Sequence, residues 1–140
     1  MKPKDKKLLL NDLSARLPYG VKVGTLDNDG SLGNIWDVLW YNTFTEDIKL
    51  INSIEDADKI IDVSEIKPYL FPLSSMTEEQ CYKLASIRSG FQDCWKYIKT
   101  PIPLSICNFE QIDWFHKNHF DYRGLIEKGL ALDATNLEIY

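Results

Sequence analysis

The chain lacks the residues that mark metal-binding, redox-active and secreted proteins. It has only three cysteines, Cys81, Cys94 and Cys107, and none belongs to a C-x-x-C pair that could begin a zinc site or a redox motif. Its first residues contain too short an apolar stretch for a signal peptide, and no run approaches the length of a membrane span. We therefore expect a cytoplasmic protein that makes no contact with a membrane.

Positive charge is scarce as well. The chain has 16 lysines and arginines against 21 aspartates and glutamates, a formal net charge of -5. The deficit is largest between residues 27 and 66, where ten acids stand against only Lys49 and Lys59. Proteins that bind nucleic acid draw most of their affinity from Lys and Arg side chains that neutralise phosphates. We therefore expect no nucleic-acid partner.

Familiar catalytic motifs are absent too. There is no G-x-S-x-G nucleophile turn, no glycine-rich loop followed by Lys-Ser or Lys-Thr, and no G-x-G-x-x-G after a predicted strand. We therefore predict no catalytic residue and no cofactor, and we expect a binding protein rather than an enzyme. The absence of these motifs leaves open only an enzyme whose catalytic residues are scattered along the chain.

The residues that are present are typical of one globular domain. With 140 residues, 44% of them hydrophobic and 26% charged, the chain is long enough for one core and too short for two. We predict a single α+β domain over residues 1–140, strand-rich from 18 to 73 and helical from 75 to 131. Strands grouped before helices favour this class over an alternating, parallel α/β fold.

The first half of the chain predicts one helix and then strands. Leucines at 9, 10, 13 and 17 recur at helical spacing and stop at Pro18. The turn sequence at residues 28–30 predicts a hairpin, and further strands are expected at 48–51 and within 52–66. Residues 67–72 contain two prolines and are expected to form an edge segment or a connector. The sheet should thus be small and antiparallel, with three to five strands.

The second half predicts three C-terminal helices. Capping-box patterns at residues 77–80 and 108–111 are each followed by apolar residues at helical spacing. The first helix is expected to run from 77 to about 98 and to include Cys94 and Trp95. The second should extend from 108 through 115. A third should begin with Asp121 as N-cap and end at Gly129.

Both histidines of the chain fall in one short segment beside two carboxylates. Asp113, His116 and His119 are spaced by three, so on a helix they form one stripe, and Asp121 follows them. Two imidazoles and a carboxylate could bind a divalent metal and leave positions open for water or substrate. A metal-dependent hydrolase or metal-binding protein is therefore one alternative. The other interpretation is structural, with the histidines near a helix C-terminus and Asp121 capping the next helix.

Four aromatic residues cluster in one predicted hairpin arm, namely Trp36, Trp40, Tyr41 and Phe44. Alternation along a strand sends Trp40 and Tyr41 to opposite faces, so both cannot readily enter one core. An aromatic left on the outer face among acids would be a natural anchor for a partner protein. The alternative is that the C-terminal helices or a dimer mate cover it.

Two segments resemble a family of short bacterial proteins found in prophage-like regions. They are residues 66–79 (IKPYLFPLSSMTEE) and residues 119–131 (HFDYRGLIEKGLA). The resemblance implies a mobile-element setting and brings no activity with it. We therefore expect a phage- or prophage-associated accessory protein that acts through protein–protein interaction. A second alternative is an acidic mimic of nucleic acid, which would block a DNA-binding protein with strong salt dependence.

Overall fold

The fold combines strands that pair with their neighbours in the sequence and strands contributed by the C-terminal part of the chain. The computed structural model describes residues 1–87 and 107–140. The first half contains helix α1 (Pro3–Arg16) and strands β1 (Lys22–Leu26), β2 (Leu32–Asn42), β3 (Asp47–Asn52), β4 (Ala57–Asp62) and β5 (Ile66–Pro72). The second half contains helices α2 (Glu78–Ser86) and α3 (Phe109–Lys117) and strands β6 (Phe120–Asp121) and β7 (Leu132–Asp133). Short 3-10 helices connect them, at η1 (Leu17–Tyr19), η2 (Val63–Glu65) and η3 (Leu73–Ser75).

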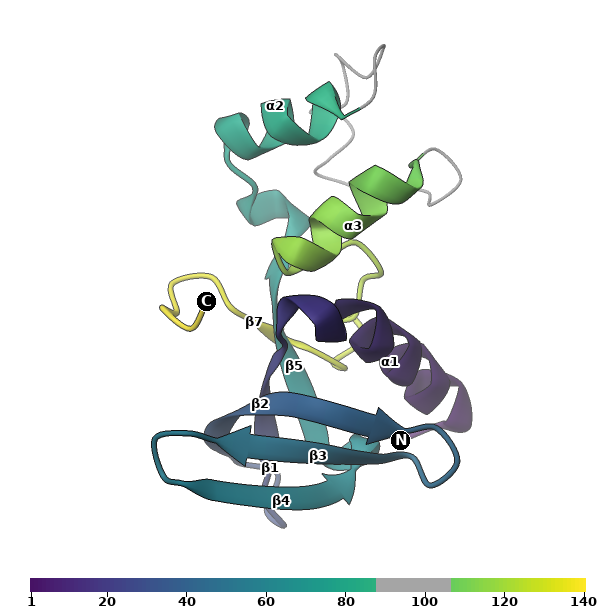
Figure 1. Ribbon diagram of the computed structural model, residues 1–140, viewed down its shortest axis with the longest axis vertical. Helices are drawn as coiled ribbons and strands as arrows, with labels where there is room; N and C mark the ends of the chain where they lie inside the picture. Colours follow the sequence, from purple (N-terminus) through teal and green to yellow (C-terminus); the bar gives the residue numbers. More distant parts are fainter. Residues whose placement is uncertain (88–106) are drawn as a thin grey trace.

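The strands form one mixed, seven-stranded sheet. Its order is β4-β3-β2-β1-β5-β6, and β7 also pairs with β5. The neighbours from β4 to β5 are antiparallel, whereas β6 and β7 run parallel to β5. In Figure 1, β5 rises from the β1–β4 part of the sheet toward α2 and α3. This strand therefore links the lower and upper parts of the molecule.

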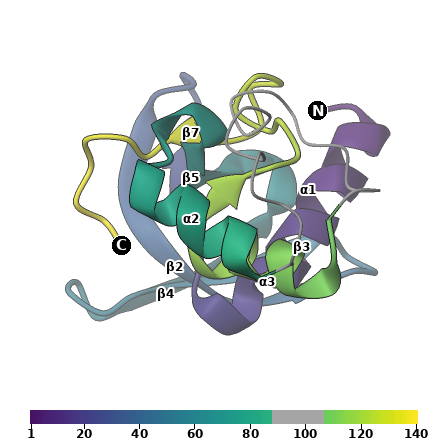
Figure 2. The ribbon, with the colours of Figure 1, turned by 90° about the horizontal axis from the view of Figure 1, so that it is seen from above.

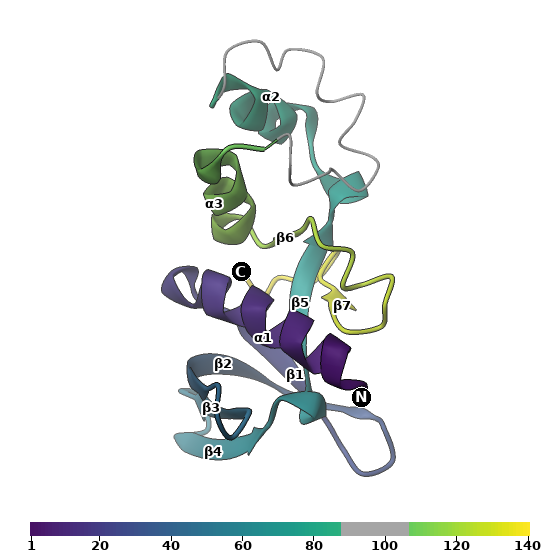
Figure 3. The same cartoon turned by 90° about the vertical axis from the view of Figure 1, so that its right-hand side faces the viewer.

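Helix α1 covers one face of strands β1–β4, which we call the inner face. Leu9 and Leu13 of α1 are 0% and 1% exposed, and they belong to one core cluster with Ile48 and Leu50 of β3. Ile48 and Leu50 are two residues apart, so strand alternation points both to the same face. Burying an aliphatic side chain contributes roughly 1.5–3 kcal/mol, so this cluster holds α1 across the sheet, as Figure 3 shows.

A second core cluster joins the two C-terminal helices to the end of β5. It contains Leu84 of α2, Phe115 of α3 and Phe120 of β6. Both helices begin with the expected capping boxes, in which the side chain at the N-cap and the side chain three residues later each accept a backbone N–H. Figure 2 shows α2 and α3 next to each other when the molecule is seen from above.

The prediction of three C-terminal helices around a small antiparallel sheet is wrong. Residues 122–131 form turns instead of a helix, because Gly124 and Gly129 adopt left-handed φ angles of 69° and 70°. Asp121 accepts hydrogen bonds from the backbone N–H groups of Leu125 at 2.9 Å and Ile126 at 2.8 Å. The aspartate thus closes a loop rather than opening a helix. The chain on either side of this loop pairs with β5.

The expected edge segment at residues 67–72 is in fact a central strand. β5 pairs with β1 through its first half and with β6 and β7 through its second half. The Phe71 N–H, which lies between the two prolines, donates to the His119 carbonyl at 2.8 Å. Parallel partners that arrive some 50 residues later leave no local pattern in the sequence. The sheet is consequently larger than predicted, and mixed.

The first C-terminal helix is described only in part. α2 ends at Ser86 with Ile87 as its C-cap, and the rest of the predicted helix, including Cys94 and Trp95, lies outside the described residues. No helix in the described ranges is long and apolar enough to cross a membrane.

Candidate functional site

A β-bulge in β2 decides which aromatic side chains reach the surface. Val38 pairs with Leu50 and Tyr41 pairs with Ile48, whereas Trp40 pairs with Lys49. The register shifts between Val38 and Trp40, so Leu39 is the extra residue. Leu39 and Trp40 therefore both oppose Lys49, on the face away from α1, while Tyr41 turns to the inner face. Without the extra residue, strict alternation would send Trp40 inward and Tyr41 outward.

The face of β2–β4 away from α1, which we call the outer face, is rich in exposed apolar side chains. Exposed fractions are 39% for Ile35, 49% for Leu39, 39% for Trp40 and 55% for Ile60. The cross-strand register places the half-buried Ile51 of β3 on the same face. In Figures 1 and 3, α2 and α3 lie at the far end of β5, away from these strands. The outer face is thus left open by the described helices.

The four aromatics predicted to bind a partner divide into two pairs. Trp36 is 8% exposed on the inner face, where the Lys59 ammonium lies 4.5 Å from its ring centroid. Tyr41 is half-buried and packs against the core cluster beneath α1. Trp40 is partly exposed on the outer face, and Phe44, in the turn between β2 and β3, is 97% exposed. Only the latter two are placed to meet another molecule.

Trp40 also borders a shallow pocket at the corner of the sheet. Leu17 of η1 forms one side of it, and Tyr41, Asn42 and Thr43 line the rest. The Asn42 side chain accepts hydrogen bonds from the N–H groups of Phe44 at 2.9 Å and Thr45 at 3.3 Å. These bonds fix the turn that presents Phe44. A rigid turn of this kind can hold an aromatic anchor at low entropic cost.

Ion pairs cross the outer face between its apolar side chains. The Lys49 ammonium lies 2.5 Å from Asp58, and the Lys22 ammonium lies 2.8 Å from Asp37. The Lys49 ammonium, as hydrogen-bond donor and as positive charge, holds the pKa of Asp58 below its usual range. These pairs neutralise Asp37 and Asp58, the two acids that lie between the apolar side chains of the outer face. A partner can therefore cover these two acids without burying an unpaired charge.

The four residues predicted to bind a metal do not converge. His116 shares a 2.6 Å hydrogen bond between Nε2 and the Tyr122 hydroxyl, and His119 stacks on the Tyr140 ring with centroids 3.5 Å apart. Asp113 is exposed, and its carboxylate lies 3.8 Å from His116 Nδ1. Asp121 is occupied by the two backbone N–H groups described above. Within residues 1–87 and 107–140, no group of three or more His, Cys, Asp or Glu side chains could hold a metal ion.

Burial changes the acid–base behaviour of both histidines. It lowers the pKa of His119 to about 4, with further contributions from the positive charges of Arg16 and Lys22. It also lowers the pKa of His116, again with help from Arg16. Both imidazoles are therefore neutral at pH 7. His119 adopts a left-handed φ of 62° just beyond the end of α3, so its place in the chain reversal is structural.

A buried charge cluster that the sequence did not predict ties α1 to residues 120–123. Asp12 and Arg16 are both 0% exposed, and Arg16 Nε donates to the Asp12 carboxylate at 2.7 Å. Arg16 also donates to the Phe120 carbonyl at 2.7 Å, and Arg123 Nε lies 3.1 Å from the second Asp12 oxygen. Both guanidinium groups lie against the Tyr122 ring. An Asp and an Arg four residues apart predict only an exposed helical pair, so the sequence did not reveal this role.

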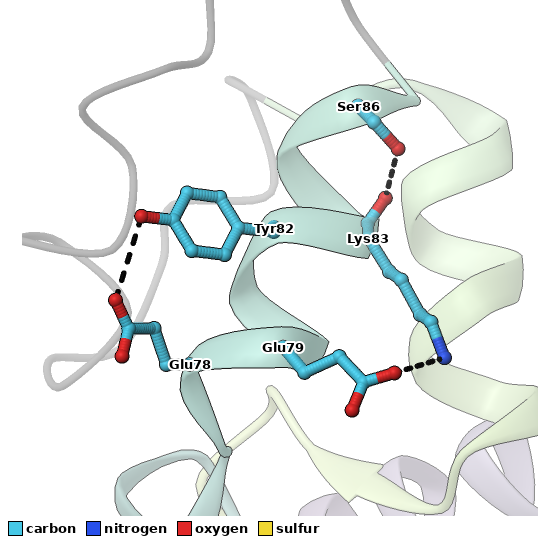
Figure 4. A pocket seen from close by; sticks show the side chains of 5 residues that line it. All are labelled: Glu78, Glu79, Tyr82, Lys83 and Ser86. Atoms are coloured by element: carbon cyan, nitrogen blue, oxygen red, sulfur yellow. Dashed lines mark hydrogen bonds and ion pairs between the residues drawn. The ribbon is translucent and has the colours of Figure 1, made fainter.

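A second shallow pocket lies on α2 and is shown in Figure 4. Its polar groups are satisfied locally, since Lys83 pairs with Glu79 at 3.1 Å and the Tyr82 hydroxyl donates to Glu78 at 3.4 Å. The side chains come from consecutive turns of one short helix, and all of them face water. This pocket offers a matched control surface for experiments on the outer face.

Comparison with known proteins yields one partial likeness. No family model matches the chain, and no solved structure matches it. The chain is 31% identical over 84 residues to a curated protein, tRNA-specific 2-thiouridylase MnmA of Halothermothrix orenii. The match covers 60% of this chain and 19% of the relative. The chain thus spans about a fifth of the length of the curated relative that it matches.

Proposed function

We propose that this chain is a phage- or prophage-associated accessory protein that acts by binding another protein through its outer face. The observation that supports the binding role most strongly is the bulge at Leu39, which turns Leu39 and Trp40 outward together. With Ile35 of β2 and Ile60 of β4 they form an exposed apolar strip, which the Lys49–Asp58 ion pair crosses. Exposed apolar side chains gathered on one face of a globular domain mark interaction sites, and aromatic residues are favoured anchors in them.

The phage setting rests on the resemblance of residues 66–79 and 119–131 to proteins of prophage-like regions. In the structure these segments meet, because β5 falls in the first and β6 in the second. They build the internal framework of the fold, whereas the outer face belongs to β2–β4. We expect the partner to be set by the outer face.

The alternatives have less support. The two histidines predicted for a metal-dependent hydrolase are each engaged by a tyrosine, as described above. The partial likeness to a tRNA-modifying enzyme does not favour an RNA partner, since a net charge of -5 opposes contact with phosphates. An acidic mimic of nucleic acid would depend on charge alone. It would give the apolar strip no role.

Site-specific photo-crosslinking tests the proposal directly. A photoreactive phenylalanine analogue is placed at Trp40 or Phe44 in one set of variants and at Tyr82 in the control, and irradiated cells are examined for adducts. Tyr82 is a matched control because it is a 64% exposed aromatic on α2. We expect one discrete protein adduct from positions 40 and 44 and none from position 82.

The same experiment can overturn the proposal. If positions 40 and 44 give no protein adduct, or the same adducts as position 82, the outer face is not the binding surface. Adducts with nucleic acid would favour the tRNA-related alternative. Circular dichroism of each variant confirms that the substitution leaves the fold intact, since all three positions are exposed.

A further inference from the structure

Some acids around the outer face form ion pairs with lysines, and others do not. Lys22 pairs with Asp37, and Lys49 pairs with Asp58. Lys6 pairs with both Glu46 and Asp62. Six of the ten acids between residues 27 and 66 have no lysine or arginine of residues 1–87 and 107–140 within ion-pair distance. They are Asp27, Asp29, Asp47, Glu55, Asp56 and Glu65. The remaining lysine of this stretch, Lys59, is engaged with the Trp36 ring on the inner face.

Four of these acids lie at one end of the sheet. Asp27 and Asp29 stand in the loop between β1 and β2, and Glu55 and Asp56 in the turn between β3 and β4. The Asn34 side chain, near the start of β2, donates to Glu55 at 3.0 Å, which shows that the two connections lie side by side. All four carboxylates are exposed. We call these four residues the acidic end.

Apolar side chains continue from the outer face into the acidic end. Leu32, at the start of β2, is 48% exposed, and Ile54, in the turn between β3 and β4, is 95% exposed. Exposed acids thus lie at one end of the apolar strip, beside Leu32 and Ile54. This arrangement places an apolar surface next to charges of one sign, which steers and selects a partner of the opposite sign.

We propose that the partner presents a lysine- or arginine-rich segment with apolar side chains, whose basic residues lie at the acidic end while its apolar residues cover the outer face. This inference rests on the proposed function and specifies the chemistry of its partner. Two outer faces of this chain do not fit one another, because the two lysines of β2–β4 already contact Asp58 and the Trp36 ring. Two copies, each with a charge of -5, would also repel one another.

Two sets of variants with equal charge change test the inference. In the first set the acidic end is neutralised by D27N, D29N, E55Q and D56N. Asparagine suits Asp56 because this residue has a left-handed φ of 50°. In the control set E78Q, E79Q, E110Q and D113N neutralise four exposed acids of α2 and α3, at the other end of the molecule. Both sets raise the net charge by the same amount.

The probe is a short fluorescent peptide that alternates lysine and valine, compared with one that alternates glutamate and valine. We expect the lysine peptide to bind the wild-type chain more weakly as salt is raised, and the acidic-end variant to bind it about tenfold more weakly. The control set should bind like the wild type. The glutamate peptide should not bind.

Three results would overturn the inference. They are equal binding of the two peptides, an equal loss in both variant sets, or no binding of the lysine peptide at low salt. If the crosslinking of positions 40 and 44 succeeds while the peptides fail in any of these ways, the outer face still binds a protein and only the basic chemistry is wrong. A W40A variant separates the two surfaces. If W40A and the wild type bind the lysine peptide equally well, the acidic end binds basic residues but the outer face takes no part, and the proposed function fails.

Discussion

Trp40 and Tyr41 are neighbours in β2, yet they oppose residues of opposite character across the sheet. Trp40 lies opposite Lys49 on the outer face, and Tyr41 lies opposite the fully buried Ile48 on the inner face. The extra residue at the bulge, Leu39, sets which of the two faces the core. One inserted residue thus separates a structural aromatic from an aromatic that is free to bind.

The two aromatics should differ in their effect on stability. Because Tyr41 packs against the core beneath α1, Tyr41→Ala should lower the free energy of unfolding by about 1–3 kcal/mol. Trp40→Ala should lower it by less than Tyr41→Ala does, since Trp40 lies outside the core cluster and 39% of it faces water. Urea denaturation followed by circular dichroism measures both. A larger loss for the tryptophan variant would mean that Trp40, rather than Tyr41, is the residue in the core.

Asp12 should be among the most sensitive positions of the chain. Asp12→Asn removes the carboxylate that balances Arg16, and an uncompensated buried charge typically costs about 3–5 kcal/mol. Glu79→Gln, which breaks an exposed helical pair with Lys83, serves as the control and should leave stability nearly unchanged. Equal midpoints of urea denaturation for the two variants would show that the Asp12 carboxylate is not required.

Stability should fall in mild acid because of His119. The unfolded chain protonates this side chain near pH 6.5, whereas burial keeps the native pKa at about 4. Between these values the unfolded state binds more protons than the native state, so the free energy of unfolding decreases as the pH is lowered and levels off below about 4.

The His119→Asn variant isolates this effect. Asparagine tolerates the left-handed backbone at this position and does not titrate, while His116 remains in both proteins. The difference in unfolding free energy between wild type and variant should therefore slope with pH in this window and be flat above it. Parallel curves over the whole range would show that His119 is accessible to protons in the native state.

Local patterns in the sequence predicted the elements that depend on local interactions. The leucine spacing of α1, the Gly30 turn and the two capping boxes are all present in the structure. Each is decided within a few residues of chain. The pairing of strands far apart in the sequence was not predicted. β6 and β7 pair with β5 on either side of residues 122–131, which form turns where a helix was expected, and no short segment of the sequence indicates such a partner.

In the candidate site, too, local features could be predicted from the sequence and long-range ones could not. Alternation correctly separates Trp40 from Tyr41 but cannot tell which of them faces the core, because a bulge changes the answer. The apolar residues of β4 could have been added from alternation, since Asp58 and Ile60 share a face of that strand. The buried roles of Arg16 and Asp12 depend on contacts with Phe120 and Arg123, respectively, more than a hundred residues away, and have no sequence signal.

The central claim is that the outer face is the binding surface. It is tested most directly by measuring how tightly the crosslinked partner binds to a variant of this face and to a control variant. Isothermal titration of the wild type, Trp40→Ala and Tyr82→Ala compares an outer-face aromatic with an exposed aromatic of α2. Because truncating an anchoring tryptophan commonly costs about 2 kcal/mol or more, we predict that Trp40→Ala weakens binding at least about tenfold and Tyr82→Ala leaves it unchanged. An unchanged affinity of the Trp40→Ala variant would contradict the assignment of the outer face as the binding surface.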